Sequence, residues 1–295
     1  MIDVAHLTKR YGSVLAVDDL SFRAEPGRVT GFLGPNGAGK TTTLRALVAL
    51  LHPTGGDATV LGKPYAELER PARTVGAILE ANAFHPGRTG RNHLRTIAAA
   101  DAIEERRIDE VLELVDLSAA ADRRTKGYSL GMKQRLSLAG ALLGDPQVLI
   151  LDEPANGLDP QGIRWLRDLL RSLASEGRTV LVSSHVLTEM AQLADDVVII
   201  AKGRLIRQAP MAEVLAGGAH GTRVRTPDPD RLVAALEREG ISASPTDGVL
   251  VVDAPAARVG EVAAGAGVVL HELVSQVESL EDVFLDLTEG ASSPS

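Results

Sequence analysis

The chain has 295 residues, of which 44% are hydrophobic and 24% charged, so it can form about two globular domains and is not disordered throughout. It contains no cysteine, which excludes disulfides, thiol catalysis and cysteine-ligated zinc. Its net charge of −8 argues against a general nucleic-acid-binding protein.

The first 215 residues alternate apolar strands with helical stretches, which is typical of an α/β domain with a mainly parallel sheet. Short continuous apolar runs are expected for strands that are buried on both faces. Two strands joined at Gly12 suggest an added antiparallel sheet. The expected elements, in chain order, are strands Ile2–Tyr11, Val14–Arg23 and Arg28–Leu33, helices Leu44–Leu51 and Arg91–Ala100, strand Val148–Leu151, helix Ile163–Leu173, and strands Thr179–Val182 and Val197–Ala201.

A glycine-rich loop over residues 34–41, called the phosphate loop below, follows the strand that ends at Leu33. It fits the pattern G-x-x-x-x-G-K-[ST]. Its glycines let backbone N–H groups turn towards phosphates, and the helix that begins near Lys40 adds the positive end of its dipole. Lys40 is expected to reach the β- and γ-phosphates, and the hydroxyl of Thr41 to ligate Mg²⁺. The alternative is a chance glycine-rich turn. The candidate nucleotide contacts are Gly34, Pro35, Asn36, Gly37, Ala38, Gly39, Lys40, Thr41 and Thr42.

Two adjacent carboxylates end the strand that begins at Val148. Asp152 is expected to hold Mg²⁺, and Glu153 to activate the attacking water as general base. Pro154 stops the strand. Without the phosphate loop, the same residues would be read as an ordinary solvated strand end.

These residues resemble those of an ABC-type ATPase, the nucleotide-binding subunit of a transporter, over about residues 2–215. The resemblance implies a P-loop ATPase domain with a parallel sheet core, an added antiparallel β-sheet and a helical subdomain. Tyr11 matches the aromatic that stacks on adenine, unless it is simply a sheet-surface residue. His185 matches the switch histidine that contacts the γ-phosphate, although an isolated histidine is more often ordinary. Asp159 lies in the loop that crosses the dimer interface of the family.

Residues 128–135 stand where the family places its signature, usually Leu-Ser-Gly-Gly-Gln. Ser129 and Gly131 are kept, whereas Leu130 and Met132 depart from that form. The resemblance implies that Ser129, Gly131 and Met132 contact the γ-phosphate held by the other subunit. A serine before a helix can also be only an N-cap.

Glu80 takes the place of a glutamine that touches Mg²⁺ and the attacking water in the family. We expect Glu80 to be a catalytic group and a Mg²⁺ ligand. The stretch that follows it, to about Ala100, matches the region that receives the coupling helix of the membrane subunit. Together with the signature and the C-terminal extension, Glu80 resembles the ATP subunits of ABC-2 type exporters, several of which move antibiotics or antimicrobial peptides.

Charge and glycine content divide the chain near residue 216. Residues 216–295 hold five Arg, no Lys and thirteen Asp or Glu, which accounts for the whole net charge of −8. We therefore expect an ATPase domain over 1–215, a glycine-rich linker over 216–222, an acidic α/β domain over 223–290 and a frayed tail over 291–295. The strands expected in the small domain are Arg223–Arg225, Gly248–Val252 and Gly267–Leu273, and the helices are Pro229–Glu239, Val259–Ala264 and one from Ser279.

The last helix carries an apolar stripe that either packs on its own sheet or forms a dimer contact, made of Leu280, Val283, Phe284 and Leu287.

The interpretation is an ATPase that uses ATP and Mg²⁺ to power a membrane exporter. The expected partners are a permease and a second ATPase subunit, as a homodimer that sandwiches two ATPs, with no nucleic acid. With no signal peptide and no run of about 18 apolar residues, we expect the chain at the cytoplasmic membrane face through the permease. Three alternatives stay open: a soluble ABC ATPase acting on ribosomes or DNA, a non-catalytic ATP-dependent regulator, and an importer. A GTPase is disfavoured because Asn-Lys-x-Asp is absent.

Overall fold

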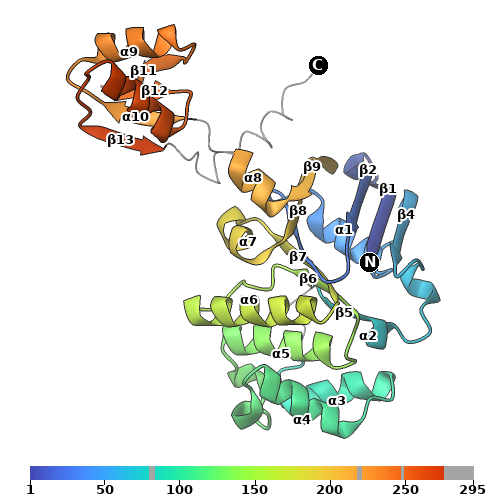
Figure 1. The fold of residues 1–295 in the computed structure, drawn as a ribbon. Coiled ribbons are helices and arrows are strands. Elements are labelled where there is room, and N and C mark those ends of the chain that lie inside the picture. Colours follow the sequence, from blue (N-terminus) through green and yellow to red (C-terminus); the bar gives the residue numbers. More distant parts are fainter. Residues whose placement is uncertain (80–83, 218–220, 247–248, 276–295) are drawn as a thin grey trace. The chain divides into compact units, whose positions relative to one another are not determined.

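The computed structural model describes residues 1–79, 84–217, 221–246 and 249–275 (Figure 1). They divide into a larger compact unit over Met1–Met211 and a smaller one that begins at Ala212. Both combine helices and strands, so the expected α/β class is confirmed.

A six-stranded sheet forms the centre of the larger unit, in the order β5-β6-β7-β3-β8-β9. Every neighbouring pair is parallel except β8 and β9. The expected strand Thr179–Val182 is too short: Ser183 and Ser184 still pair with β3 and belong to β7. The strands are β3 (Val29–Leu33), β5 (Val75–Ile78), β6 (Val148–Asp152), β7 (Thr179–Ser184), β8 (Asp196–Ala201) and β9 (Arg204–Pro210).

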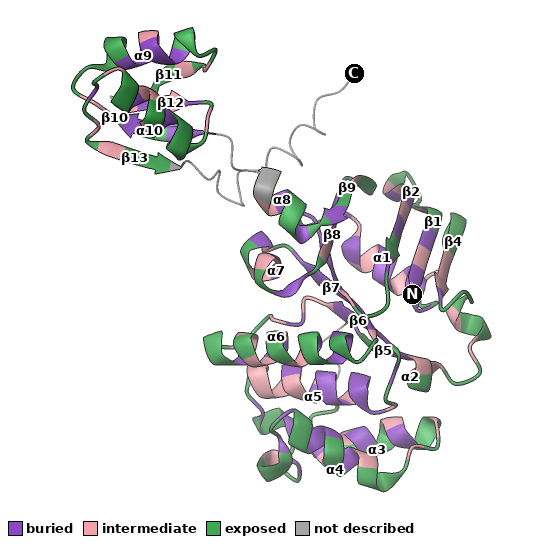
Figure 2. Cartoon of the chain, in the orientation of Figure 1, coloured by how far each residue is buried: buried purple, intermediate pink, exposed green. Residues whose placement is uncertain are grey.

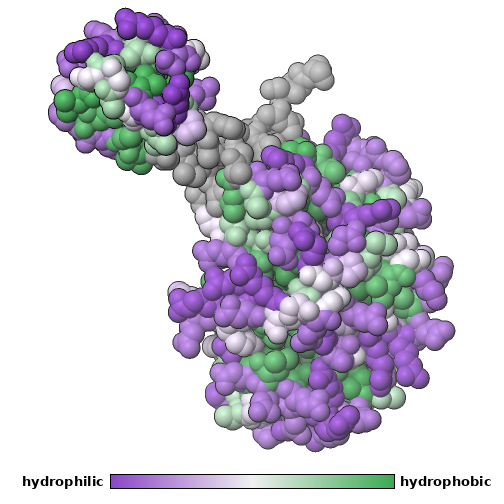
Figure 3. Space-filling view, in the orientation of Figure 1, coloured by the Kyte–Doolittle hydropathy of each residue, from purple (hydrophilic) through white to green (hydrophobic). Residues whose placement is uncertain are grey.

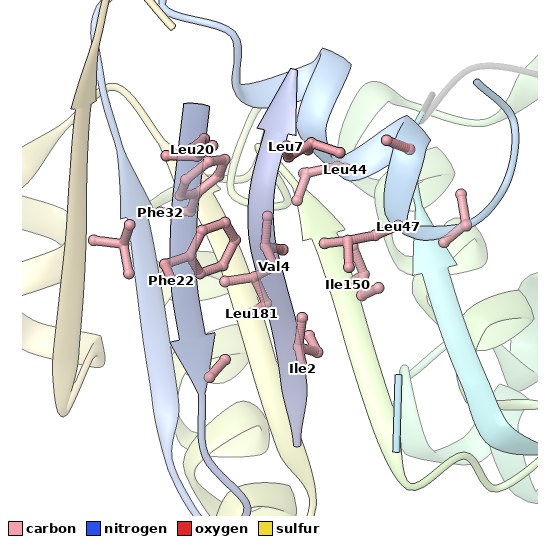
Figure 4. Close-up of a cluster of buried hydrophobic side chains, with 14 of the residues drawn as sticks. Ile2, Val4, Leu7, Leu20, Phe22, Phe32, Leu44, Leu47, Ile150 and Leu181 are labelled. Atoms are coloured by element: carbon pink, nitrogen blue, oxygen red, sulfur yellow. The ribbon is translucent and has the colours of Figure 1, made fainter. Parts of the chain in front are cut away.

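A three-stranded antiparallel sheet, in the order β2-β1-β4, accompanies the first. Its strands are β1 (Ile2–Tyr11), β2 (Val14–Ala24) and β4 (Gly55–Val60), and the expected pairing of the first two is confirmed. Its buried side chains join those of α1 (Lys40–Leu47) and of the central sheet in one cluster (Figure 4). The cluster is aliphatic apart from Phe22 and Phe32, whose ring centroids are 5.1 Å apart. This packing fixes the helix that follows the phosphate loop.

The helix expected over Leu44–Leu51 is misplaced, because α1 begins at Lys40 and ends at Leu47. Ala49 adopts a left-handed φ of 57°, which a continuing helix does not permit. The chain therefore turns two residues after α1 ends.

A helical subdomain packs on the edge of the central sheet through the contacts of α5 with β5. The end of α5 approaches this edge so closely that a Cβ on Gly76 would lie 2.1 Å from the carbonyl oxygen of Ala141. This subdomain consists of three helices, which contact one another (Figure 1). They are α3 (Gly90–Ala100), α4 (Glu105–Leu114) and α5 (Leu130–Leu142). The other helices of the larger unit are α2 (Pro71–Thr74), α6 (Pro160–Ser175) and α7 (Leu187–Leu193).

Burial follows this architecture, with buried residues concentrated in the sheet strands and exposed ones along the outer helix faces (Figure 2). The face drawn in Figure 3 is largely hydrophilic, with small and separate hydrophobic patches. Within the described ranges, no helix is long and apolar enough to cross a membrane.

Helix α8 (Met211–Gly217) begins at the last residue of the larger unit and continues into the smaller one. The smaller unit contains a four-stranded antiparallel sheet in the order β11-β12-β10-β13. Two helices, α9 (Pro229–Arg238) and α10 (Ala256–Gly265), contribute to its core. Alternate residues of β10 (Thr222–Arg225) and β12 (Val249–Val252) complete that core. The remaining strands are β11 (Ala243–Thr246) and β13 (Glu272–Ser275).

Several expectations for this unit are corrected. The strand expected over Gly267–Leu273 is wrong: Gly267, with φ 65°, turns the chain after α10, Val268 enters the core, and β13 starts only at Glu272. No strand was expected at β11. Ala216 and Gly217, expected in a linker, belong to α8. The helix expected from Ser279, with Leu280, Val283, Phe284 and Leu287, lies outside the described residues.

Candidate active site

The phosphate loop connects β3 with α1, and close backbone contacts hold it. Gly39 has φ 106°, and a Cβ there would lie 2.6 Å from the carbonyl oxygen of Ala16. Only glycine fits such a position. The N–H of Gly203, in the turn between β8 and β9, donates to the carbonyl oxygen of Ala38 at 3.0 Å. The loop is therefore hydrogen-bonded to the turn between β8 and β9, and its backbone lies close against β2.

Lys40 places a buried ammonium group beneath this loop, with 7% of its side chain exposed. Its Nζ donates to the carbonyl oxygens of Gly34 at 2.6 Å and Pro35 at 3.3 Å, and lies 3.8 Å from Glu153 Oε1. Burial lowers the pKa of Lys40, while the charges of Glu153 and Asp152 act in the opposite direction. A cation is thus held where the start of α1 also favours anions.

Asp152 joins three elements through its two carboxylate oxygens. The Thr41 hydroxyl, on α1, donates to Oδ2 at 2.7 Å. The Ser183 hydroxyl, on β7, donates to Oδ1. Asp152 and Ser183 are partners in the parallel register of β6 and β7, which explains this contact. Thr41 and Asp152 therefore present neighbouring oxygen atoms, the ligand type that Mg²⁺ prefers.

Glu153 leaves the strand in an unusual conformation, with φ 49°. Its N–H donates to the Ser183 hydroxyl oxygen at 3.0 Å. Its two carboxylate oxygens each lie 3.0 Å from His185 Nδ1. The carboxylate is 22% exposed, so it is partly shielded and still accessible to water.

A cavity of about 230 Å³ brings the loop and the carboxylates together. The residues that the sequence predicts as nucleotide contacts in the phosphate loop line this cavity, except Gly34 and Ala38, which are buried within the loop. Tyr11, Ser129, Gly131, Met132, Asp159 and His185 do not line it, although His185 contacts Glu153, which does. The lining residues are Ala16, Pro35, Asn36, Gly37, Gly39, Lys40, Thr41, Thr42, Asp152 and Glu153.

Tyr11 ends β1 and is 47% exposed. The Nζ of Lys9 lies 5.1 Å from its ring centroid. This is an exposed aromatic at the end of a sheet strand, and its expected contact with adenine stays a prediction.

The signature and the loop before α6 meet within one chain. Ser129 caps α5 by accepting from the Met132 N–H at 3.2 Å, and Asp159 caps α6 by accepting from the Gly162 N–H at 2.7 Å. A Cβ on Gly131 would lie 3.4 Å from the carbonyl oxygen of Gly157. The capping roles are present in the single chain, and the expected contacts with nucleotide across a dimer stay predictions.

Glu80 lies outside the described residues. Two further residues adjoin the site and were not expected from the sequence. Ser183 could have been noticed as a polar residue that continues an apolar run beside Asp152. Glu189, in the first turn of α7, has a pKa raised first by burial and then by the charge of Glu153, with His185 opposing the shift.

The profile of the ABC transporter family matches residues 17–156, and that of a domain of unknown function (DUF8746) matches residues 220–281. The chain is 36% identical to Bacitracin transport ATP-binding protein BcrA of Bacillus licheniformis, over 99% of this chain and 98% of the relative. It is 37% identical to Nod factor export ATP-binding protein I of Burkholderia pseudomallei (strain 1710b), over 97% of this chain and 96% of that protein.

Solved structures support the same fold. One ATP-binding subunit of an ABC transporter has a TM-score of 0.67 and 28% identity, covering 74% of this chain and 92% of that chain. A dimeric ATP-binding cassette in a post-hydrolysis state, bound to ADP and Pi, has a TM-score of 0.66 over 72% of this chain and 99% of that chain. At 21% identity, the second likeness concerns the fold alone.

Proposed function

The chain belongs to the ATP-binding subunits of ABC transporters, which bind and hydrolyse ATP, and we propose that it powers a membrane exporter. The observation that carries the proposed chemistry is the meeting of Lys40, Thr41, Asp152 and Glu153 around one cavity. The direction of transport is inferred from relatives whose names refer to bacitracin transport and to Nod factor export.

The proposed reaction is in-line attack of water on the γ-phosphate of ATP. Lys40 and the N-terminus of α1 bind the phosphates and stabilise the charge that develops on them. The Glu153 carboxylate accepts the proton of the attacking water. His185, whose Nδ1 is held by Glu153, would reach the γ-phosphate through Nε2.

Thr41 and Asp152 fit Mg²⁺, which is commonly bound by one or two carboxylates together with substrate phosphates. Mg²⁺ held there would neutralise phosphate charge. Glu80 is proposed as an additional ligand and catalytic group.

Subunits of this family dimerise and pair with membrane subunits. We propose that two copies of this chain form the dimer. The N-terminus of α5, with Ser129, Gly131 and Met132, and the loop that contains Asp159 then complete the nucleotide site of the other copy. A helix N-terminus suits this role because its free N–H groups favour phosphate oxygens.

A second cavity, of about 320 Å³, is the proposed docking site for the coupling helix of the permease. It lies between the edge strand β5 and the helices α3 and α5. Phe84 and His93 pack edge to face at its wall, with ring centroids 4.8 Å apart. Docking there would place the chain at the cytoplasmic face of the membrane.

Single-cysteine crosslinking tests this docking, because the chain has no cysteine of its own. Ile97→Cys places a thiol in the wall of the cavity, and Leu114→Cys, at an exposed position of α4, is the matched control. With a permease reconstituted in proteoliposomes, the first variant is expected to crosslink to the permease, and the control variant is not. Equal crosslinking of both variants would reject the docking site. Movement of substrate towards the side of the membrane on which the ATPase subunit lies would reject export.

The domain division is also proposed on functional grounds. Every candidate site residue lies before residue 211, so the ATPase activity is assigned to the first domain. We assign no catalytic role to the acidic domain over 223–290.

A further inference from the structure

We propose that Ser183 is a positioning residue for ATP hydrolysis, which holds Asp152 and Glu153 in their working arrangement. The inference rests on the proposed function, since it takes Glu153 as the general base. Ser183 is fully buried at the end of β7, and its hydroxyl contacts both acidic residues.

The first contact orients the Asp152 carboxylate. The Ser183 hydroxyl donates to Oδ1, while Thr41 donates to Oδ2 at 2.7 Å. Donors on both oxygens leave the carboxylate little freedom to rotate about its terminal bond. A hydroxyl on the strand beside Asp152 therefore fixes the plane in which this carboxylate faces the phosphate loop.

The second contact holds the backbone of Glu153. Its N–H donates to the same hydroxyl oxygen at 3.0 Å, and its φ of 49° is unfavourable for a residue with a side chain. Such a conformation persists only where the surroundings enforce it. Here it turns the Glu153 carboxylate towards His185 Nδ1 and to within 3.8 Å of Lys40 Nζ.

Serine suits the position because one hydroxyl donates once and also accepts. Alanine would leave a partly buried N–H of Glu153 without this partner and one oxygen of Asp152 without this donor. Both changes loosen the acidic pair by small distances. Misplacement of about 1 Å at a reacting group can cost about 100-fold in rate.

The test is Ser183→Ala in the full chain, with Thr179→Val as control. Thr179 is a buried hydroxyl residue at the other end of the same strand, where it accepts from the amino group of Met1 at 2.9 Å. Ser183→Ala is expected to lower kcat about 10- to 100-fold while KM for ATP changes less than about threefold. Thr179→Val is expected to keep wild-type kcat.

A double-mutant cycle separates positioning from a general structural effect. Residual hydrolysis by Glu153→Gln is measured in single turnover with radiolabelled ATP, with and without Ser183→Ala. Because Ser183 acts through Glu153 as well as Asp152, the second change is expected to lower this rate by a clearly smaller factor than it lowers wild-type kcat, and the loss that remains is the part that acts through Asp152. If Ser183→Ala melts below the assay temperature, Ser183→Cys, with similar volume and a weaker donor, replaces it under the same criteria.

Two results would overturn the inference: a kcat of Ser183→Ala within about threefold of wild type, or an equal loss in both backgrounds. Wild-type turnover by Glu153→Gln would instead reject the general base of the proposed function. Impaired turnover by Glu153→Gln with normal turnover by Ser183→Ala leaves the proposed function intact and rejects only the role of Ser183.

Discussion

His185 Nδ1 lies 3.0 Å from both carboxylate oxygens of Glu153, although the two residues are 32 positions apart in the chain. The contact brings the proposed switch histidine and the proposed general base together at the ends of neighbouring strands. It orients the imidazole, and it makes the position of the Glu153 carboxylate depend on the loop after β7.

Glu153→Gln is expected to bind ATP and to lose about 10²- to 10⁴-fold in turnover, because an amide cannot accept the proton of water. Fluorescent ATP-analogue binding and phosphate release measure the two effects. An ATP-bound dimer should then accumulate in gel filtration. Glu113→Gln, an exposed change on α4, is the matched control and should hydrolyse ATP normally. Normal turnover in Glu153→Gln would contradict the assignment.

Lys40→Ala is expected to weaken ATP binding itself. The variant loses the buried cation that lies beneath the phosphate loop and 3.8 Å from Glu153. A charge-assisted contact of this type contributes roughly 1.5–3 kcal/mol, which corresponds to an increase of about 10- to 100-fold in the Kd for ATP. Isothermal titration calorimetry measures it, with the exposed Lys63→Ala as control. An unchanged Kd would remove Lys40 from the phosphate site.

His185→Ala is expected to keep ATP binding and to reduce turnover by about 10- to 100-fold, because the Glu153 carboxylate loses the group that orients it. The measurement is kcat and KM for ATP, with the exposed His52→Ala as control. A rise in KM with an unchanged kcat would indicate that His185 contributes only to binding.

Glu189→Gln is expected to change how stability depends on pH. Burial and the charge of Glu153 raise the pKa of Glu189 above its ordinary value of 4.5, so the folded chain holds this proton more tightly than the unfolded chain does. Stability therefore falls as pH rises from the ordinary value through the raised one. The variant lacks this loss and should gain stability relative to wild type over that window.

Urea unfolding midpoints, measured from about pH 4 to pH 7, check this expectation. The difference between Glu189→Gln and wild type should be smallest at the acidic end and should grow towards neutral pH. Glu113→Gln serves as the reference for an exposed carboxylate, of similar chemistry but away from this site. A difference that stays constant with pH would show that the Glu153 charge and burial do not act on Glu189 as described.

Much of the fold could be predicted because its signals are local. The phosphate loop occupies eight consecutive residues, so the residue types that let it bind phosphate are visible without the rest of the chain. The core strands are continuous apolar runs, and their alternation with helices implies parallel pairing. Element boundaries are not fixed locally: α1 ends at Leu47 because the chain turns at Ala49. The short strand β11 has no clear local signal, because short strands depend on pairing with their neighbours.

The chemistry of the individual site residues was therefore determined by the sequence alone: a glycine loop with Lys40 and Thr41, and a strand that ends in Asp152 and Glu153. Only the tertiary structure decided that Ser183 bonds to both acidic residues, because this contact depends on the register between β6 and β7. A shift of one residue in that register would turn the Ser183 side chain to the other face of the sheet. The register between strands that are far apart in the sequence depends on long-range packing, which no local pattern of residues specifies.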